Sequence, residues 1–163
     1  MTFNDLLEMT LKFEGGWSHD PADRGGETYA GISRKCWPGW PGWALLETLA
    51  RAVADFYEQN FWRPWARLGE TRLRAKLFDA GVNVGLAGAV RLLQRALNRQ
   101  GHDLALDGRL GPLTLAALAG ADQEALLSLI CQEQADHYQR IVAADPSQRK
   151  FARGWQRRAR WRP

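Results

Sequence analysis

The sequence predicts a mainly helical α+β protein in which one small β element lies early in the chain. Apolar residues recur at helical spacing near the N-terminus and again from residue 48 onward. Between these regions lies a glycine-rich segment with turn signals and a short stretch of strand character. The chain has 163 residues, so this pattern suits one compact domain or two closely associated parts. We expect the early β element within residues 1–70 and a helical region over residues 71–163.

The first predicted helix begins at a T-x-x-D pair, Thr2 and Asp5, which can cap the free N–H groups of its first turn. Gly15 and Gly16 are expected to end it. The residues at helical spacing along one face are Phe3, Leu6, Leu7, Thr10 and Phe13.

The segment after this helix predicts a hairpin or a three-stranded sheet. Asp20-Pro21 and the glycines at 25 and 26 are turn signals, and "ETYAGIS" at residues 27–33 has strand character. The following "CWPGWPGW" predicts an irregular loop rich in tryptophan.

Helices are predicted for most of the remaining chain. Glycine closes two of these helices, and Pro112 opens another after a break at "HDLALDGRLG". The predicted helical ranges are 48–62, 72–85, 87–101, a short helix from 112, 123–143 and 146–160.

The C-terminal segment "RKFARGWQRRARWRP" carries seven basic residues and no acidic one, whereas the formal charge of the whole chain is only +4. This asymmetry favours an anionic polymer as partner, such as nucleic acid, an anionic membrane face or cell-wall material. Equally, this segment can be a terminal helix that packs on the body and leaves its arginines in water.

Several functional classes lack support in the sequence. There is no CxxC, HExxH, GxGxxG or P-loop pattern, so we expect no metal and no nucleotide or other cofactor. The two cysteines, Cys36 and Cys131, are expected to be reduced thiols. The N-terminus lacks the basic start of a signal peptide, so we expect synthesis in a cytoplasm without one.

Glu14 is the first candidate catalytic residue. It continues the apolar stripe at the end of the first helix, where burial and the negative end of the helix are both expected to raise its carboxyl pKa. A carboxyl in such a place suits a general acid that works near neutral pH. The plainer alternative is a solvated glutamate at a frayed helix end.

Asp23 and Thr28 follow Glu14 across a series of turns that can bring them back to face it. An acid, a facing carboxylate and a hydroxyl that positions water are what inverting hydrolysis of a glycosidic bond requires. Asp20 is a rival for the second carboxylate, although Asp-Pro is also an ordinary way to begin a turn.

The segment "FEGGWSHDPADRGGETYAGIS" resembles the N-terminal signature of the glycoside hydrolase family 108 N-acetylmuramidases, which are phage and prophage endolysins. "ADFYEQNFWRPW" and "LFDAGVNVGLAGAVRLLQRALN" resemble later parts of that family, in the same order. "LDGRLGPLTLAAL" is similar to the D-G-x-x-G-x-x-T element of small peptidoglycan-binding modules.

This resemblance implies a lysozyme-like fold, with a catalytic region over residues 1–70 and a peptidoglycan-binding-like element within residues 71–163. It implies a catalytic Glu14 and cleavage of the β-1,4 bond between N-acetylmuramic acid and N-acetylglucosamine. It also implies a wall-binding role for Asp107, Gly108 and Thr114, although the same turn and helix start can be simple scaffold. The wider phage-lysozyme pattern places five residues between its Asp and Thr, which leads from Asp23 to Tyr29 instead of Thr28, so an inverting or a retaining reaction is left open.

Further side chains, including that of Tyr29, are candidates for contacts with a polysaccharide. Trp17, Trp62 or Trp65 can stack on sugar rings, with core packing as the alternative for each. Asp79 and Asn83 share one helix face, where they can bond substrate groups or cross-link helices.

The sequence is compatible with three functions. The first is a peptidoglycan muramidase, which is expected to be a monomer, to bind no nucleic acid, and to act in the periplasm or cell wall after release from the cytoplasm. The second is a lytic transglycosylase, which needs one glutamate and no water-activating carboxylate. The third is a non-catalytic wall-binding or nucleic-acid-binding module in which the basic tail is the active part. The tail is also a candidate contact for anionic outer membrane or lipopolysaccharide.

Overall fold

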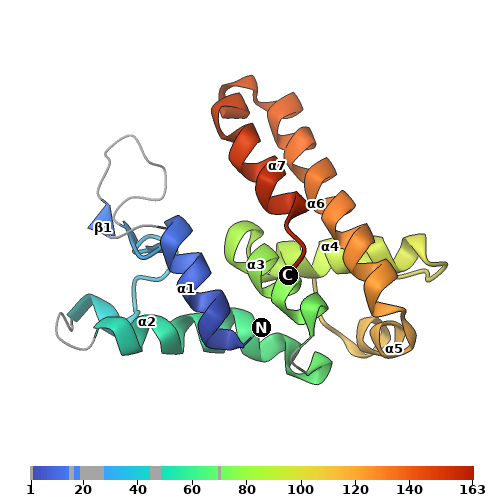
Figure 1. Ribbon diagram of the computed structural model, residues 1–163, viewed down its shortest axis with the longest axis horizontal. Helices are drawn as coiled ribbons and strands as arrows, with labels where there is room; N and C mark the ends of the chain where they lie inside the picture. Colours follow the sequence, from blue (N-terminus) through green and yellow to red (C-terminus); the bar gives the residue numbers. More distant parts are fainter. Residues whose placement is uncertain (1, 15–16, 19–27, 45–48, 70) are drawn as a thin grey trace. The chain divides into compact units, whose positions relative to one another are not determined.

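The computed structural model describes residues 2–14, 17–18, 28–44, 49–69 and 71–163. Its elements are mainly helical, with a three-stranded sheet of order β1-β2-β3 early in the chain (Figure 1), which confirms the predicted α+β class. The chain forms two compact units, Met1–Pro64 and Trp65–Pro163.

Helix α1 (Phe3–Glu14) begins with the capping pair that the sequence predicts. The Thr2 N–H donates to the Asp5 carboxylate at 2.8 Å, and the Asp5 N–H donates to the Thr2 hydroxyl at 3.3 Å. This reciprocal arrangement satisfies N–H groups that a helix start otherwise leaves free. Leu6, Leu7 and Thr10 on one face of the helix are buried.

The sheet consists of β1 (Trp17–Ser18), β2 (Thr28–Tyr29) and β3 (Ile32–Ser33), all antiparallel. Ala30 and Gly31 join β2 to β3, and both have positive φ (47° and 80°), as a two-residue type I′ hairpin requires. The Tyr57 hydroxyl donates to the Ala30 carbonyl at 2.5 Å. Helix α2 therefore holds the hairpin turn in place, in a conformation that alanine adopts only at a cost.

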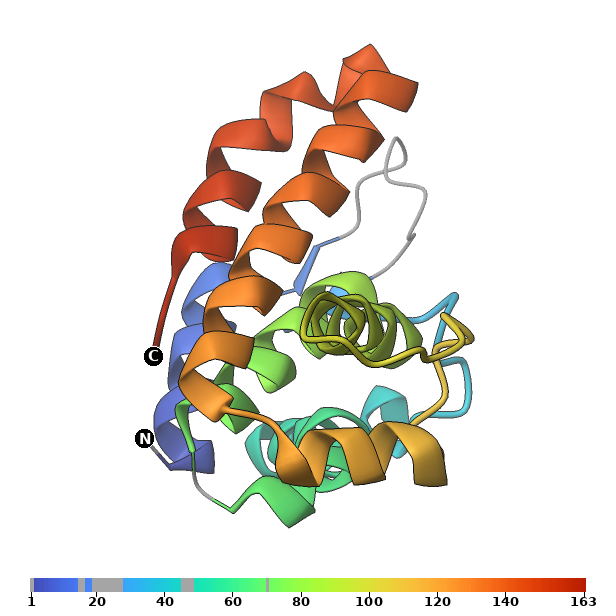
Figure 2. The same ribbon diagram turned by 90° about the vertical axis from the view of Figure 1, so that its right-hand side faces the viewer.

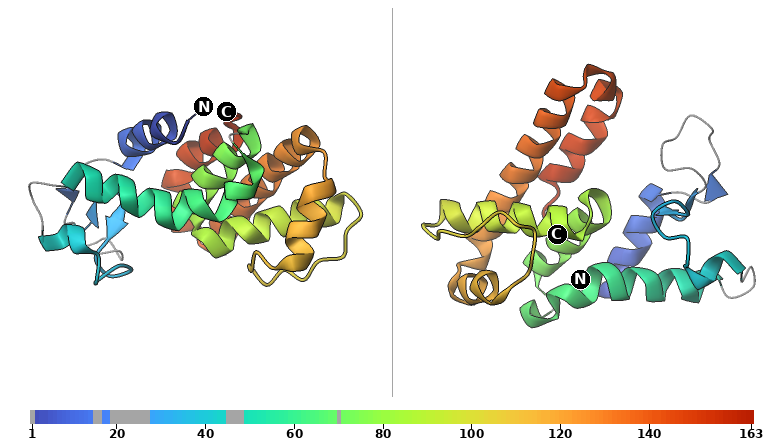
Figure 3. Two further views of the ribbon diagram at one scale, coloured as in Figure 1. Left: turned by 90° about the horizontal axis from the view of Figure 1, so that it is seen from below. Right: turned by 180° about the vertical axis from the view of Figure 1, so that it is seen from behind.

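Helix α2 (Leu49–Tyr57) continues through a π-helical turn, η2 (Glu58–Trp62), into the 3₁₀-helix η3 (Arg63–Leu68), as Figure 3 shows. Pro64 lies in the first turn of η3, and it has no N–H for an α-helical hydrogen bond. The tryptophan-rich loop packs on Phe56 of α2. Trp37 and Trp40 contact the Phe56 ring edge-on, with 4.9 Å and 5.9 Å between ring centroids.

The second unit is built around α3 (Arg72–Val84), α4 (Leu86–Arg99), α5 (Pro112–Gly120) and α6 (Gln123–Ala144). Three of these helices begin with residues that favour a helix start. The side chains of Thr71 and Asp122 accept hydrogen bonds from backbone N–H groups in the first turns of α3 and α6, and α5 begins with Pro112. The core contains Leu77, Leu93, Leu97, Leu126 and Ile130, together with Trp65, one of the tryptophans considered for sugar stacking.

The basic C-terminal segment is docked on this unit. It forms the 3₁₀-helix η4 (Pro146–Phe151) and then α7 (Ala152–Arg160), which runs alongside α6 (Figures 1 and 2). The sequence predicts one continuous helix here, and the structure gives its first turns the tighter 3₁₀ form that is common at helix ends. Trp155 stacks on Tyr138 of α6 at 5.2 Å between ring centroids.

Lys76 of α3 binds the end of α7. Its side chain is fully buried, and its ammonium group donates to the carbonyls of Arg158, Ala159 and Trp161 at 2.9–3.1 Å. Burial lowers the pKa of the Lys76 amine below its ordinary value. These carbonyls form the negative end of α7, so the cation compensates both the helix dipole and the free acceptors.

Both cysteines are free thiols, as the sequence predicts: Cys36 is exposed and Cys131 partly buried. Burial raises the pKa of the Cys131 thiol. Among the helices of the described residues, none combines the length and the apolar character that crossing a membrane requires.

Candidate functional site

Glu14 is the last residue of α1, and β1 begins three residues later at Trp17. The backbone therefore places Glu14 where the helix ends and the small sheet starts, as predicted. The side chains of Glu14 and Trp17 and the whole of residues 19–27, which include Asp20 and Asp23, lie outside the described residues.

Thr28 and Tyr29 are consecutive residues of the middle strand, and both are half-buried. Pairing with β1 places Ser18 opposite Thr28 and Trp17 opposite Tyr29. Because consecutive residues in a strand point to opposite faces, Thr28 and Tyr29 serve different sides of this sheet. If one side of the sheet faces a substrate, only one of these two side chains, the Thr28 hydroxyl or the Tyr29 ring, can project from that side.

Trp62, the third predicted sugar contact, is only 6% exposed. Its ring lies against Phe3, with 5.8 Å between centroids, and so joins the start of α1 to η2. The structure thus shows a packing role for Trp62, and its place in a sugar subsite stays a prediction.

Asp79 and Asn83 lie one turn apart on α3, and both contact the C-terminal helices. The Asp79 carboxylate accepts a hydrogen bond from the Arg158 guanidinium of α7 at 2.8 Å, and both side chains are largely buried. The Asn83 side-chain oxygen accepts from the Tyr138 hydroxyl of α6. These contacts match the cross-linking role that the sequence leaves open as an alternative to substrate binding.

The predicted wall-binding residues Asp107, Gly108 and Thr114 surround one buried side chain, Gln94 of α4, which is 1% exposed. Its amide NH₂ donates to the Asp107 carboxylate at 2.8 Å and to the Thr114 hydroxyl at 3.3 Å. Its amide oxygen accepts from the Gly108 N–H at 3.1 Å. The hydrogen bond from Gln94, with the Arg109 N–H second, lowers the pKa of the Asp107 carboxyl.

Gly108 meets two requirements at this turn. Its φ of 73° is in the left-handed region, and a Cβ atom would lie 2.9 Å from the Ala87 carbonyl oxygen. The motif residues therefore fold the loop onto α4, while the exposed side chains here belong to residues between Gly108 and Thr114, in the loop and the first turn of α5. Leu113, at 77% exposed, is the most prominent of these apolar side chains.

Sequence reasoning missed Gln94 and Lys76. The sequence feature that could have identified them is a polar residue among the apolar residues of a helix face. Gln94 lies one turn after Val90, and Lys76 lies between Ala75 and Leu77. A buried polar group needs a partner, so such a position indicates a specific contact even before the partner is known. Over the described ranges, no group of histidine, cysteine, aspartate and glutamate is placed to hold a metal ion.

Comparisons with known proteins agree with these observations. Residues 7–85 match the family model described as glycosyl hydrolase 108, and residues 88–160 match the one described as predicted peptidoglycan domain. None of the curated proteins matches the chain. Among solved structures, that of Brucella abortus SagA is similar, with 25% identity and a TM-score of 0.74 over 96% of this chain and 88% of that one. This likeness supports the lysozyme-like, mainly helical fold expected from the sequence.

Proposed function

Because residues 7–85 belong to the glycosyl hydrolase 108 family and a peptidoglycan domain follows at 88–160, we propose that this peptidoglycan hydrolase is an N-acetylmuramidase with Glu14 as its general acid. It would cleave the β-1,4 bond between N-acetylmuramic acid and N-acetylglucosamine. The observation that best supports this assignment is the position of Glu14, at the end of α1 and directly before the sheet, inside the matched hydrolase region.

The proposed chemistry follows from this position. In this proposal Glu14, at the C-terminal end of α1, donates a proton to the leaving oxygen. Asp23, or its rival Asp20, activates water from the opposite face of the sugar, and the Thr28 hydroxyl helps to position that water. Carboxyl groups roughly 6.5–9.5 Å apart would give inversion, whereas about 5 Å would give a covalent, retaining reaction.

The products test this proposal directly. Digestion of purified peptidoglycan in heavy-oxygen water is expected to give fragments that end in reducing N-acetylmuramic acid, each with one heavy oxygen atom, by mass spectrometry. Anhydro-muramic ends without the label would identify a lytic transglycosylase instead. Reducing N-acetylglucosamine ends would move the cleavage to the other glycosidic bond.

In this proposal the protein is an endolysin-type enzyme that works as a monomer on peptidoglycan in the periplasm or cell wall, after release from the cytoplasm in which it is made. The basic C-terminal segment contributes a contact with anionic outer membrane or lipopolysaccharide. Trp155 faces Tyr138 and Ala159 is buried, so exposed arginines, with Phe151 at 46% exposed, are what the segment offers to this contact. The arginines of α7 that are exposed are Arg153, Arg157 and Arg160.

Replacement of these three arginines by Gln is expected to weaken binding to lipopolysaccharide vesicles at low salt and to remove most of its salt dependence. Screening explains the effect, since the Debye length falls from about 10 Å at 0.1 M to about 3 Å at 1 M salt. Arg158 is left intact because it bonds Asp79. Sedimentation with the vesicles at both salt concentrations measures the change.

A charge-matched control replaces three exposed arginines elsewhere, Arg67, Arg95 and Arg109, by Gln. Hydrolysis of a short soluble glycan is expected to be equal in all three proteins. An equal loss of vesicle binding in the control variant would show that only net charge matters, and would contradict a contact through α7.

A further inference from the structure

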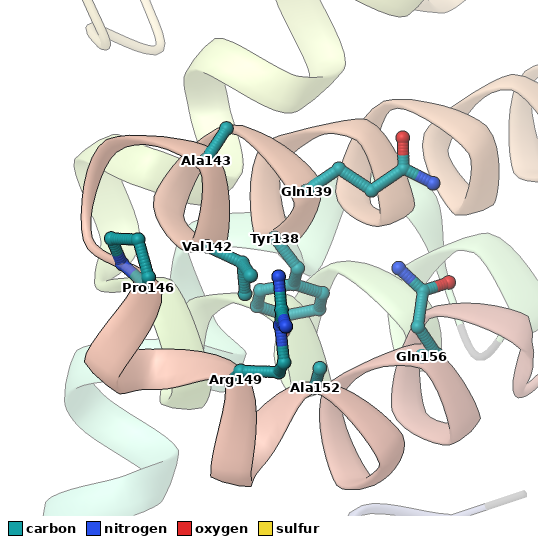
Figure 4. Close-up of a pocket in the computed structure, with 8 residues that line it drawn as sticks. All are labelled: Tyr138, Gln139, Val142, Ala143, Pro146, Arg149, Ala152 and Gln156. Carbon is teal, nitrogen blue, oxygen red and sulfur yellow. The ribbon is translucent and has the colours of Figure 1, made fainter.

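A cavity of about 350 Å³ opens between α6 and the C-terminal pair η4 and α7 (Figure 4). It lies wholly within the region that matches the peptidoglycan domain. The residues that line it are Tyr138, Gln139, Val142, Ala143, Pro146, Arg149, Ala152 and Gln156.

The interior of this cavity is apolar and made of small groups. Val142 and Ala143 come from α6, and Pro146 and Ala152 from the facing elements. The Tyr138 ring contributes to the wall and is fixed on two sides, because it stacks on Trp155 and its hydroxyl group bonds Asn83 and Gln134. The surface of the cavity is therefore mostly apolar and suits a ligand that carries methyl groups, while Gln139, Gln156 and Arg149 are its polar side chains.

Arg149 is the one basic residue among those that line this cavity. The Arg149 side chain extends from η4 towards Val142 and Tyr138 in Figure 4. The start of η4 is fixed by Asp145, whose carboxylate accepts the Ser147 N–H at 3.0 Å. Within the described part of the chain, the Arg149 guanidinium has neither a hydrogen bond nor an ion pair, so its donors are available to a ligand.

A guanidinium with free donors favours a carboxylate, which it can bind through two parallel hydrogen bonds. Beside it, the small apolar walls favour a methyl group. Peptidoglycan offers both together in its stem peptides, which contain alanine methyls and free carboxylates, whereas its glycan strands offer mainly hydroxyls. We propose that the cavity between α6 and η4–α7 binds a peptidoglycan stem peptide, with an alanine side chain against Val142 and Ala152 and a carboxylate on Arg149.

This inference rests on peptidoglycan as the substrate of the proposed function, and it adds a second point of contact away from the glycan bond that is cleaved. The hydrolase region and the cavity would then recognise different parts of one polymer. Such a division would favour glycan strands that still carry their peptides over strands from which the peptides have been removed.

The test is a titration of the full-length protein with a synthetic stem peptide, L-Ala–D-Glu–diaminopimelate–D-Ala, followed by calorimetry. Arg149→Gln is expected to weaken binding about tenfold or more, the scale of one lost hydrogen bond to a charged group. Ala152→Leu, which fills the cavity, is expected to weaken it as well. The matched control is Arg153→Gln, which removes the same charge from an exposed position on α7 that does not line the cavity.

Three outcomes would overturn the proposal: equal affinities for Arg149→Gln and Arg153→Gln, unchanged affinity in Ala152→Leu, or tighter binding of a peptide-free chitin oligosaccharide to the cavity. Two variants distinguish a failure of stem-peptide binding from a failure of the proposed hydrolase function. Glu14→Gln is expected to bind the stem peptide normally while losing hydrolysis, and Arg149→Gln is expected to cleave peptide-free glycan at the normal rate.

Discussion

Glu14→Gln is expected to lower the rate of peptidoglycan hydrolysis about a hundredfold or more, the usual scale for the loss of a general acid. Gln has the shape of Glu but carries no proton of suitable acidity, so the leaving oxygen must depart without protonation. The backbone of α1 sets the position of residue 14, so the substitution is not expected to move this residue. Clearing of a wall suspension, followed by turbidity, measures the rate.

The control is Glu8→Gln, an exposed position on the same helix, which is expected to retain full activity. Thermal unfolding should be the same for both variants and the parent protein. If Glu14→Gln kept more than a tenth of the parent activity, Glu14 would not be the acid. The same assay on Asp23→Asn and Asp20→Asn decides which carboxylate works with Glu14, because only the partner should show a comparable loss.

Asp79→Leu is expected to destabilise the second unit by about 3 kcal/mol, because it leaves a largely buried guanidinium without its carboxylate. For a chain of this size the corresponding fall in melting temperature is roughly 6–12 °C. Calorimetry measures the shift. The double variant Asp79→Leu with Arg158→Met is expected to recover much of the loss, because an apolar pair can replace a buried ion pair at little cost.

Asp136→Leu on the exposed side of α6 provides the control and is expected to change the stability by less than about 0.5 kcal/mol. A functional role for Asp79 predicts a different pattern. An unchanged melting temperature together with a raised KM for soluble glycan would assign Asp79 to substrate binding and contradict its role as a helix cross-link.

The sequence by itself determined most of the helices and strands and the resemblance to two protein families. The Thr2–Asp5 capping pair, the strand character around Thr28 and the proline that opens α5 all act through neighbours a few residues away, so they can be identified without the fold. The position of Glu14 at the helix end follows from the same local signals. The motifs around Glu14 and Asp107 resembled the two families that the comparisons then matched.

Only the tertiary structure decided which partners the polar side chains have. Asp79 bonds Arg158 from 79 positions away, and Lys76 reaches carbonyls 82 to 85 positions along the chain. No local pattern distinguishes a carboxylate that binds sugar from one that binds a distant arginine, because the residue type and spacing are the same. The basic segment, which sequence composition alone could make either a free tail or a docked helix, is docked because buried Lys76 compensates the carbonyls at its end and Trp155 stacks on Tyr138.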